Sequence, residues 1–140
     1  MFKTNLASAF QLINIFAPNM KQQGWGRIIS IGSVHQDRPA GRLCIYATTK
    51  AAQLNLMKTC AVELAPFGVT VNTITPGVIH TDRNAEALKD DAFAKKLLEK
   101  IPSNRFGTAE DCSGAAVFLA SNAASYIVGA DIAVAGGFQL

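Results

Sequence analysis

Helix-like and strand-like segments alternate along this chain, and the alternation is the strongest constraint on its fold. Apolar residues recur with helical spacing over residues 3–22, 45–65, 83–100 and about 108–120, and short β-branched stretches cover 27–32, 69–74 and 132–134. Alternating helices and strands build a parallel sheet that helices cover on both faces. We therefore expect an α/β fold with a doubly wound parallel sheet of about three strands.

Proline and glycine mark where these segments end. Pro18 lies late in the first helical segment and predicts a kink or an early end there, while Pro66 and Gly68 end the second. Ser33 follows the first strand, and Pro76-Gly77 follows the second. Ligands of such sheets bind beyond the carboxyl ends of the strands. The pattern therefore places Ser33 and Pro76-Gly77 on the same rim of a ligand crevice.

The composition indicates a folded chain with extra covered surface. With 140 residues, 49% of them hydrophobic and 16% charged, the chain has the size and apolar content of a single domain with one core, not of a disordered segment. The net charge is only +3, and Lys and Arg are not clustered, so the basic patch of a nucleic-acid binder is absent. The apolar surplus suggests a subunit interface.

Cysteine, histidine and hydropathy patterns argue against a metal site, a disulfide framework and a membrane span. The three cysteines are Cys44, Cys60 and Cys112. The cysteines are odd in number and far apart, and the two histidines, His35 and His80, are also far apart in the sequence. We therefore expect no metal site and a reducing, cytoplasmic setting. No apolar run approaches the ~20 residues that cross a bilayer. Polar residues interrupt residues 1–20, which suit an amphipathic helix better than a secretory signal.

Tyr46 and Lys50 are the first candidates for chemistry. They lie four residues apart at the start of a predicted helix, so their side chains share one face. A phenol is ordinarily too weak an acid to exchange protons freely at neutral pH. A neighbouring ammonium favours the phenolate, which makes a tyrosine a workable general acid/base. A Tyr–Lys pair at this spacing also occurs often as a plain surface pair, and the spacing alone leaves both interpretations open.

Two rim segments could contact a ligand. Ser33 lacks the surroundings of a nucleophile elbow and has no His–Asp partner set, so it is better interpreted as a hydrogen-bond donor, or as a simple turn former. Residues 76–81 could bind a planar amide or a phosphate through backbone groups and the Thr81 hydroxyl, or could merely end a strand. His80 has no partner signal and is interpreted as a loop residue.

Taken together, these residues resemble the short-chain dehydrogenase/reductase family. The matching motifs are Asn5-Leu6, residues 26–33 (GRIISIGS), residues 46–50 (YATTK), residues 71–77 (VNTITPG), residues 118–121 (FLAS), Gly129 and Gly136-Gly137. Their order and spacing cover essentially the whole chain. The resemblance implies a Rossmann-like fold and hydride transfer between a nicotinamide cofactor, NAD or NADP, and a small carbonyl or alcohol substrate.

The resemblance also implies a role for each site residue. Tyr46 would be the general acid/base, and Lys50 the cation beside it and a ligand of the nicotinamide ribose. Ser33 would orient the substrate, and Asn5 would hold water in a proton relay. Pro76, Gly77, Ile79 and Thr81 would line the nicotinamide. Specificity is expected from residues 33–42 and from 81 to about 106, and a homo-oligomer from helices 3–22 and 45–65.

The sequence departs from the family pattern at one important point. It contains no glycine-rich turn of the kind that cradles a cofactor pyrophosphate, and no Asn-Ala-Gly element. We therefore expect residues 1–140 to be a single partial Rossmann-type domain, the catalytic and substrate-side half, with the first strand at an exposed sheet edge and little or no turnover. The alternative is a non-enzymatic remnant or a helix-mediated interaction module.

Overall fold

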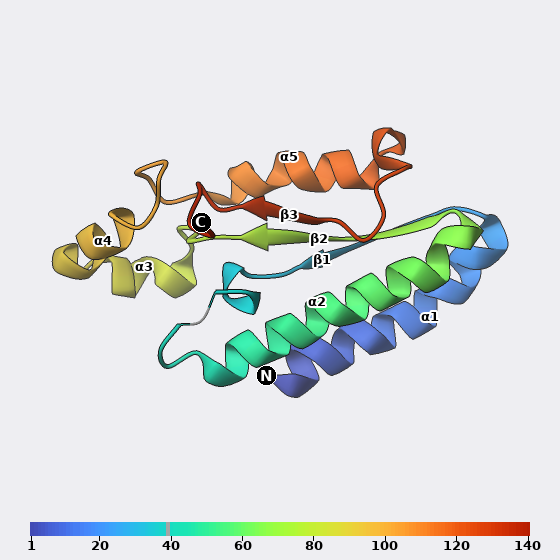
Figure 1. Cartoon of the computed structure of the whole chain (residues 1–140), viewed down its shortest axis with the longest axis horizontal. Helices are drawn as coiled ribbons and strands as arrows, with labels where there is room; N and C mark the ends of the chain where they lie inside the picture. The colour runs from blue at the N-terminus through green and yellow to red at the C-terminus, as the bar shows by residue number, and fades with distance from the viewer. Residues whose placement is uncertain (39) are drawn as a thin grey trace.

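Three parallel strands form the centre of the molecule. The computed structural model describes residues 1–38 and 40–140 (Figure 1). Strands β1 (Gly26–Ile31), β2 (Val69–Pro76) and β3 (Asp131–Val134) form one sheet in the order β1-β2-β3, with both pairs parallel. The predicted α/β fold with about three parallel strands is confirmed. Pro39, in the predicted loop 33–42, lies outside the described residues.

Strand β2 is the central strand and runs two residues further than its sequence pattern predicts. Thr75 and Pro76 pair with Ala133 and Val134 of β3, which extends the ladder to the proline. Val69 and Val71 are fully buried on the same strand as Ile74, so both faces of β2 are covered. Strand β1 pairs with β2 alone among the described strands, as expected for an edge.

Helices cover the two faces of the sheet separately. Helices α1 (Ser8–Gln23) and α2 (Cys44–Leu64) lie on one face, and α5 (Ala109–Ala120) lies on the other (Figure 1). Ile13 and Ala17 of α1 pack with α2 side chains against β2. Leu119 of α5 packs against Ile74 from the opposite side. The apolar core is therefore divided by the sheet into two layers.

The first helical segment differs from the prediction in two ways. Residues 2–7 form a π-helical stretch before α1 begins, and α1 continues past Pro18 to Gln23. The predicted early end at Pro18 is therefore wrong. Pro18 lies on the exposed side of a helix whose other side is anchored in the core by Ala17, so the loss of one backbone N–H does not end it. Gly24, with φ +67°, ends the helix instead.

The predicted single helix over residues 83–100 is two short helices. They are α3 (Asp82–Leu88) and α4 (Asp91–Leu98). Asp90 separates them, because its carboxylate accepts the backbone N–H groups of Ala92 and Phe93, each at 3.1 Å. Aspartate favours a helix N-cap over a helix interior, which explains the break. Both helices lie beyond the carboxyl ends of the strands (Figure 1).

No helix formed by residues 1–38 or 40–140 is long and apolar enough to span a membrane.

Candidate active site

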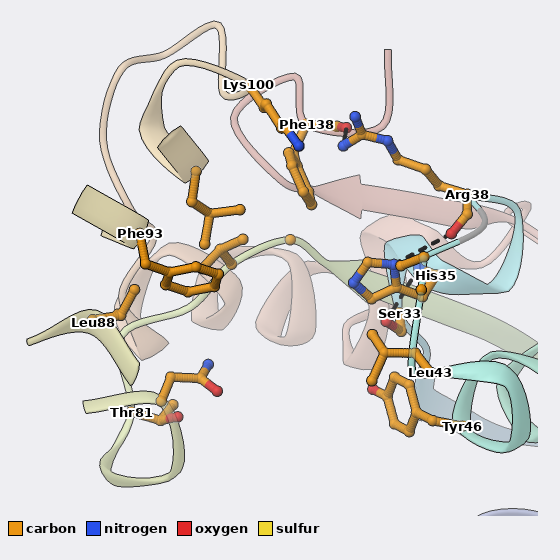
Figure 2. Close-up of a pocket in the computed structure, with 16 residues that line it drawn as sticks. Ser33, His35, Arg38, Leu43, Tyr46, Thr81, Leu88, Phe93, Lys100 and Phe138 are labelled. Carbon is orange, nitrogen blue, oxygen red and sulfur yellow. Dashed lines mark hydrogen bonds between the residues drawn. The ribbon is translucent and has the colours of Figure 1, made fainter. Parts of the chain in front are cut away.

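The carboxyl ends of β1 and β2 open into a cleft of about 820 Å³ (Figure 2). One side of the cleft is formed by the turn after β1 and the first turn of α2, which bring Ser33 and Tyr46 together. The other side is formed by Gly77 after β2 and by side chains of α3 and α4. The structure thus gathers at one rim residues that are far apart in the sequence, because parallel strands end at the same edge.

Ser33 is buried at the floor of this cleft, with 6% of its surface exposed. Its hydroxyl oxygen accepts the backbone N–H of His35 at 3.2 Å. Its own backbone N–H donates to Oε1 of Gln36 at 3.3 Å. These bonds fix the serine in the first turn of a short 3₁₀ helix (Val34–Gln36) and leave the hydroxyl hydrogen for a ligand.

A buried polar network supports the turn that carries Ser33. The amide nitrogen of Gln36 donates to the Thr75 hydroxyl at 3.0 Å and to the Asp131 carboxylate at 2.6 Å, and Thr75 donates to the same carboxylate. The network leaves no room at Gly32, where a Cβ would lie 2.7 Å from Oε1 of Gln36. Gly32 is therefore required by the close approach of Gln36, and the network connects Ser33 to β2 and β3.

Tyr46 and Lys50 lie one helical turn apart in α2, but only Tyr46 lines the cleft. The Lys50 Nζ donates to the Ile31 carbonyl at 2.7 Å and to Oε1 of Gln53 at 3.0 Å. Burial lowers the pKa of Lys50. The described residues use two of the three ammonium hydrogens, so one remains for a ligand hydroxyl or for the phenol. Lys50 is thus held at the end of β1 beside the turn that carries Tyr46.

Asn5 is connected to the same turn of α2 from the π-helical stretch. Its Nδ2 donates to the Thr49 hydroxyl at 3.0 Å, and Thr49 in turn donates to the Tyr46 carbonyl at 2.8 Å. Thr49 is fully buried. Asn5 does not line the cleft. Its side-chain nitrogen is occupied by Thr49, which leaves Oδ1 to accept a bond from water.

The segment after β2 divides between two hollows. Gly77 and Thr81 line the main cleft, whereas Ile79 lines a smaller hollow of about 240 Å³. Gly77 is needed for packing, because a Cβ there would lie 2.8 Å from the Cα of Ala135. The Ile79 carbonyl accepts Nδ2 of Asn84 at 2.8 Å. Pro76 is the last residue of β2, lies partly buried and lines neither hollow.

His80 lies on the exposed surface between these hollows. Its backbone N–H donates to the Gly107 carbonyl at 2.7 Å, in a single parallel bridge next to Ile79. Its side chain does not line either hollow.

Phe138 is a cleft residue that the sequence patterns do not reveal. It is 5% exposed and lies edge-on to the His35 ring, with centroids 6.4 Å apart. The Arg38 guanidinium lies 4.2 Å from its ring centroid and donates to its carbonyl at 2.7 Å (Figure 2). The sequence around Phe138 carries no signal for this, because the contact joins positions 100 residues apart.

In the described part of the chain, no group of three His, Cys, Asp or Glu side chains is placed to hold a metal ion.

Fold and cleft together define a Rossmann-like α/β domain. A family model described as enoyl-(acyl carrier protein) reductase matches residues 1–139. The chain belongs to the short-chain dehydrogenase/reductase family, which consists of NAD(P)-dependent oxidoreductases. The resemblance drawn from the sequence motifs is confirmed.

Curated relatives and solved structures agree with this assignment. L-rhamnose 1-dehydrogenase (NAD(P)(+)) of Azotobacter vinelandii is 38% identical over 96% of this chain, and 3-oxoacyl-[acyl-carrier-protein] reductase of Escherichia coli is 39% identical over 100%. The crystal structure of gluconate 5-dehydrogenase from Burkholderia cenocepacia, in complex with NADP and tartrate, superposes with a TM-score of 0.95 at 33% identity and covers 99% of this chain.

The chain spans about half the length of the curated relatives that it matches. The match covers 53% of the rhamnose dehydrogenase and 57% of the acyl-carrier-protein reductase. It covers 54% of the gluconate dehydrogenase structure.

Proposed function

We propose that this chain carries the proton-transfer and substrate-side half of an NAD(P)-dependent oxidoreductase that interconverts a carbonyl and an alcohol. The observation that carries the proposal is the shared cleft of Ser33 and Tyr46, with Lys50 anchored one turn further along α2. Hydroxyl donors that line one cleft, near a half-buried cation, suit a substrate oxygen on which charge develops.

The side chains divide the proton chemistry among them. Tyr46 gives a proton to the substrate oxygen in the reductive direction and takes it in the oxidative direction. Ser33 donates its hydroxyl hydrogen to the substrate oxygen, and Lys50 supplies a positive charge one helical turn from Tyr46. Asn5 holds a water through Oδ1 and so extends the path for protons behind Lys50. A nicotinamide held beside Gly77 and Thr81 would supply or accept the hydride at the substrate carbon.

The residues beside the cleft fit the nicotinamide half of NAD or NADP. Thr81 offers a hydroxyl and Gly77 lines the cleft beside it. Pro76 and Ile79 belong to the same segment, which would lie against the ring. Lys50 has one hydrogen left for the ribose. NAD(P)(+) stands in the name of the rhamnose dehydrogenase, and NADP is bound in the gluconate dehydrogenase, and we extend either cofactor to this chain.

Because the sequence contains no glycine-rich phosphate turn, we propose weak or no turnover with whole dinucleotides for residues 1–140. Reduced nicotinamide mononucleotide is the sharper probe, since it lacks the adenine half that such a turn would help to hold. We expect it to bind with a millimolar Kd and to shift the NMR signals of Thr81 and Tyr46. Binding that leaves both signals unmoved would contradict the cofactor placement.

The Tyr46→Phe variant tests the proton-transfer role. We expect it to bind the mononucleotide within about twofold of the unchanged chain and to reduce a test ketone at least about 100-fold more slowly, as general acid–base catalysis predicts. Thr59→Val, which removes a hydroxyl from the exposed side of α2, is the control and should retain the rate. Unchanged reduction by Tyr46→Phe would refute the proposed role.

A second function, helix-mediated association, is favoured by the exposed apolar residues of α1 and α2. Ile15 and Phe16 are 67% and 55% exposed, and Val62 of α2 is 77% exposed. We propose that these helices join copies of the chain into a homo-oligomer, in the cytoplasm, whether or not the chain is an enzyme.

A further inference from the structure

The cleft carries positive charge that nothing in the described part of the chain neutralises. Arg38 and Lys100 both line it, and its lining contains no aspartate or glutamate. The ion pairs formed by the described residues are Lys89–Glu86 and Arg105–Asp111, so neither cation of the cleft has a carboxylate within 4.0 Å. Two uncompensated cations on one hollow attract an anion.

Arg38 is prepared to bind that anion. One of its terminal N–H groups donates to the Phe138 carbonyl, and the guanidinium lies over the Phe138 ring. These contacts hold the planar group in place without neutralising it, and the remaining N–H donors stay available. A fixed guanidinium with two parallel donors matches the geometry of a carboxylate.

Lys100 adds a second cation to the lining of the cleft. It follows α4 and, like Arg38 and Phe138, lines the cleft drawn in Figure 2. Apolar side chains of Leu88, Phe93 and Leu97 also line the cleft, on the side formed by α3 and α4. A ligand in the cleft would therefore contact the apolar side chains of α3 and α4 as well as the positive charges of Arg38 and Lys100.

We infer that the substrate of this cleft is an aliphatic hydroxy or oxo carboxylic acid, whose carboxylate is bound by Arg38 with Lys100 while its reacting oxygen lies toward Ser33 and Tyr46. This inference rests on the proposed function for the direction in which the substrate lies. The apolar side chains of α3 and α4 contact the carbon chain between the two ends.

The test compares two ligands that differ only in charge. We would titrate the chain, at low ionic strength, with 3-hydroxyhexanoate and with its primary amide, and follow binding by calorimetry. We expect the acid to bind at least about tenfold more tightly than the amide, and this preference to shrink in added salt. Equal binding of the two, or no binding of the acid at millimolar concentration, would overturn the inference.

Variants assign the preference to the two cations. Lys100→Gln and Arg38→Gln should each lower the affinity for the acid at least about fivefold. Each should leave the affinity for the amide within twofold of that of the unchanged chain. Lys96→Gln removes the same charge from α4 outside the cleft and should change neither affinity. Arg38→Gln also removes the contacts that hold Phe138, so this variant could unfold. Lys100 is exposed, so Lys100→Gln is expected to fold and keeps the test decisive. A preference that survives both substitutions contradicts the inference.

The binding measurement uses neither cofactor nor turnover, so it separates the two proposals. If Tyr46→Phe binds the acid normally but turnover of the unchanged chain proves independent of Tyr46, the proposed function fails and the anion site stands.

Discussion

The position of Ser33 depends on residues that its own sequence neighbourhood does not point out. Gln36 contacts Asp131 across 95 positions, and the two meet only because β3 returns beside β2. Gly32 is the local sign of this network, since its missing side chain makes room for the Gln36 amide. Single-residue conformational preferences contain no information on such distant partners.

Gly32→Ala tests this dependence. We expect the added methyl group to cost about 1–3 kcal/mol of unfolding free energy, because it meets Gln36 and Thr75 in a packed site. It should also weaken ligand binding in the cleft, because the Ser33 turn must shift. Urea denaturation of the variant and the unchanged chain measures the first effect.

Gly114→Ala is the matched control for that experiment. Gly114 lies within α5, and a Cβ there meets nothing within 4 Å. We expect it to stabilise the chain by about 0.5–1 kcal/mol through helix propensity. A Gly32→Ala variant as stable as the unchanged chain would show that the network tolerates displacement.

Ser33, Tyr46 and Lys50 were identified from their positions after a strand and at a helix start, whereas the role of Asn5 came from the family resemblance alone. Ser33 and Tyr46 do meet in one cleft, and Gly77 and Thr81 lie across from them. Lys50 and Asn5 stand behind the cleft and bond to Ile31 and Thr49. Their chemical roles stay predictions, because the placement of a side chain does not establish a proton transfer.

At the scale of elements, the sequence pattern located helices better than it located breaks within them. Gly24 and Gly68 end their helices with positive φ, as glycine favours. The break at Asp90 was missed because charged residues on both sides resemble one solvent-facing helix. The local sequence did contain a signal for this break, because an aspartate directly before a new amphipathic helical segment is a favourable N-cap.

Helix α5 provides a test of a correctly predicted helix start. Asp111 accepts two hydrogen bonds from Arg105, both at 2.7 Å, and one from the Thr108 backbone N–H at 2.8 Å. These donors hold the pKa of Asp111 well below its usual value. We expect Asp111→Asn to destabilise the chain at pH 7, because the ion pair and part of the cap are lost.

The destabilisation should depend on pH in a defined direction. A carboxyl whose pKa is lowered by folding stabilises the folded state above its unfolded value, near 3.8, and this contribution is lost as pH falls through the folded value. The difference between Asp111→Asn and the unchanged chain should therefore narrow steadily below pH 4. Asp37→Asn, at an exposed residue, is the control. A difference that stays constant down to pH 2 would contradict the assignment.

At the scale of the whole molecule, α1 and α2 leave several large apolar side chains exposed. Phe10, Leu12, Ile15 and Phe16 lie on α1 with at least half of each side chain exposed. The apolar surplus in the composition predicted covered surface, and the periodicity of α1 explains where it lies. Sequence patterns alone could not separate this face from the core face, because both are apolar.

Ile15→Glu tests association through this surface. We expect the unchanged chain to sediment as an oligomer and the variant to dissociate at least about tenfold more readily, because a charge enters an apolar interface. Analytical ultracentrifugation over a range of concentrations measures the constant. Gln22→Glu adds the same charge at an exposed polar position of α1 and should leave the dissociation constant of the oligomer unchanged. A monomeric unchanged chain would disprove the proposed oligomer.

Strand β2 has a consequence for the dynamics of the cleft. Its backbone is bonded on both edges, and seven of its eight residues are buried. Its amide protons therefore exchange with deuterium only when the sheet opens globally, whereas the outer amides of β1 exchange through local fluctuations. Gly77, which lines the cleft, directly follows this slowest-exchanging segment. A ligand bound in the cleft should therefore slow deuterium uptake in α3 and α4 and not in β2.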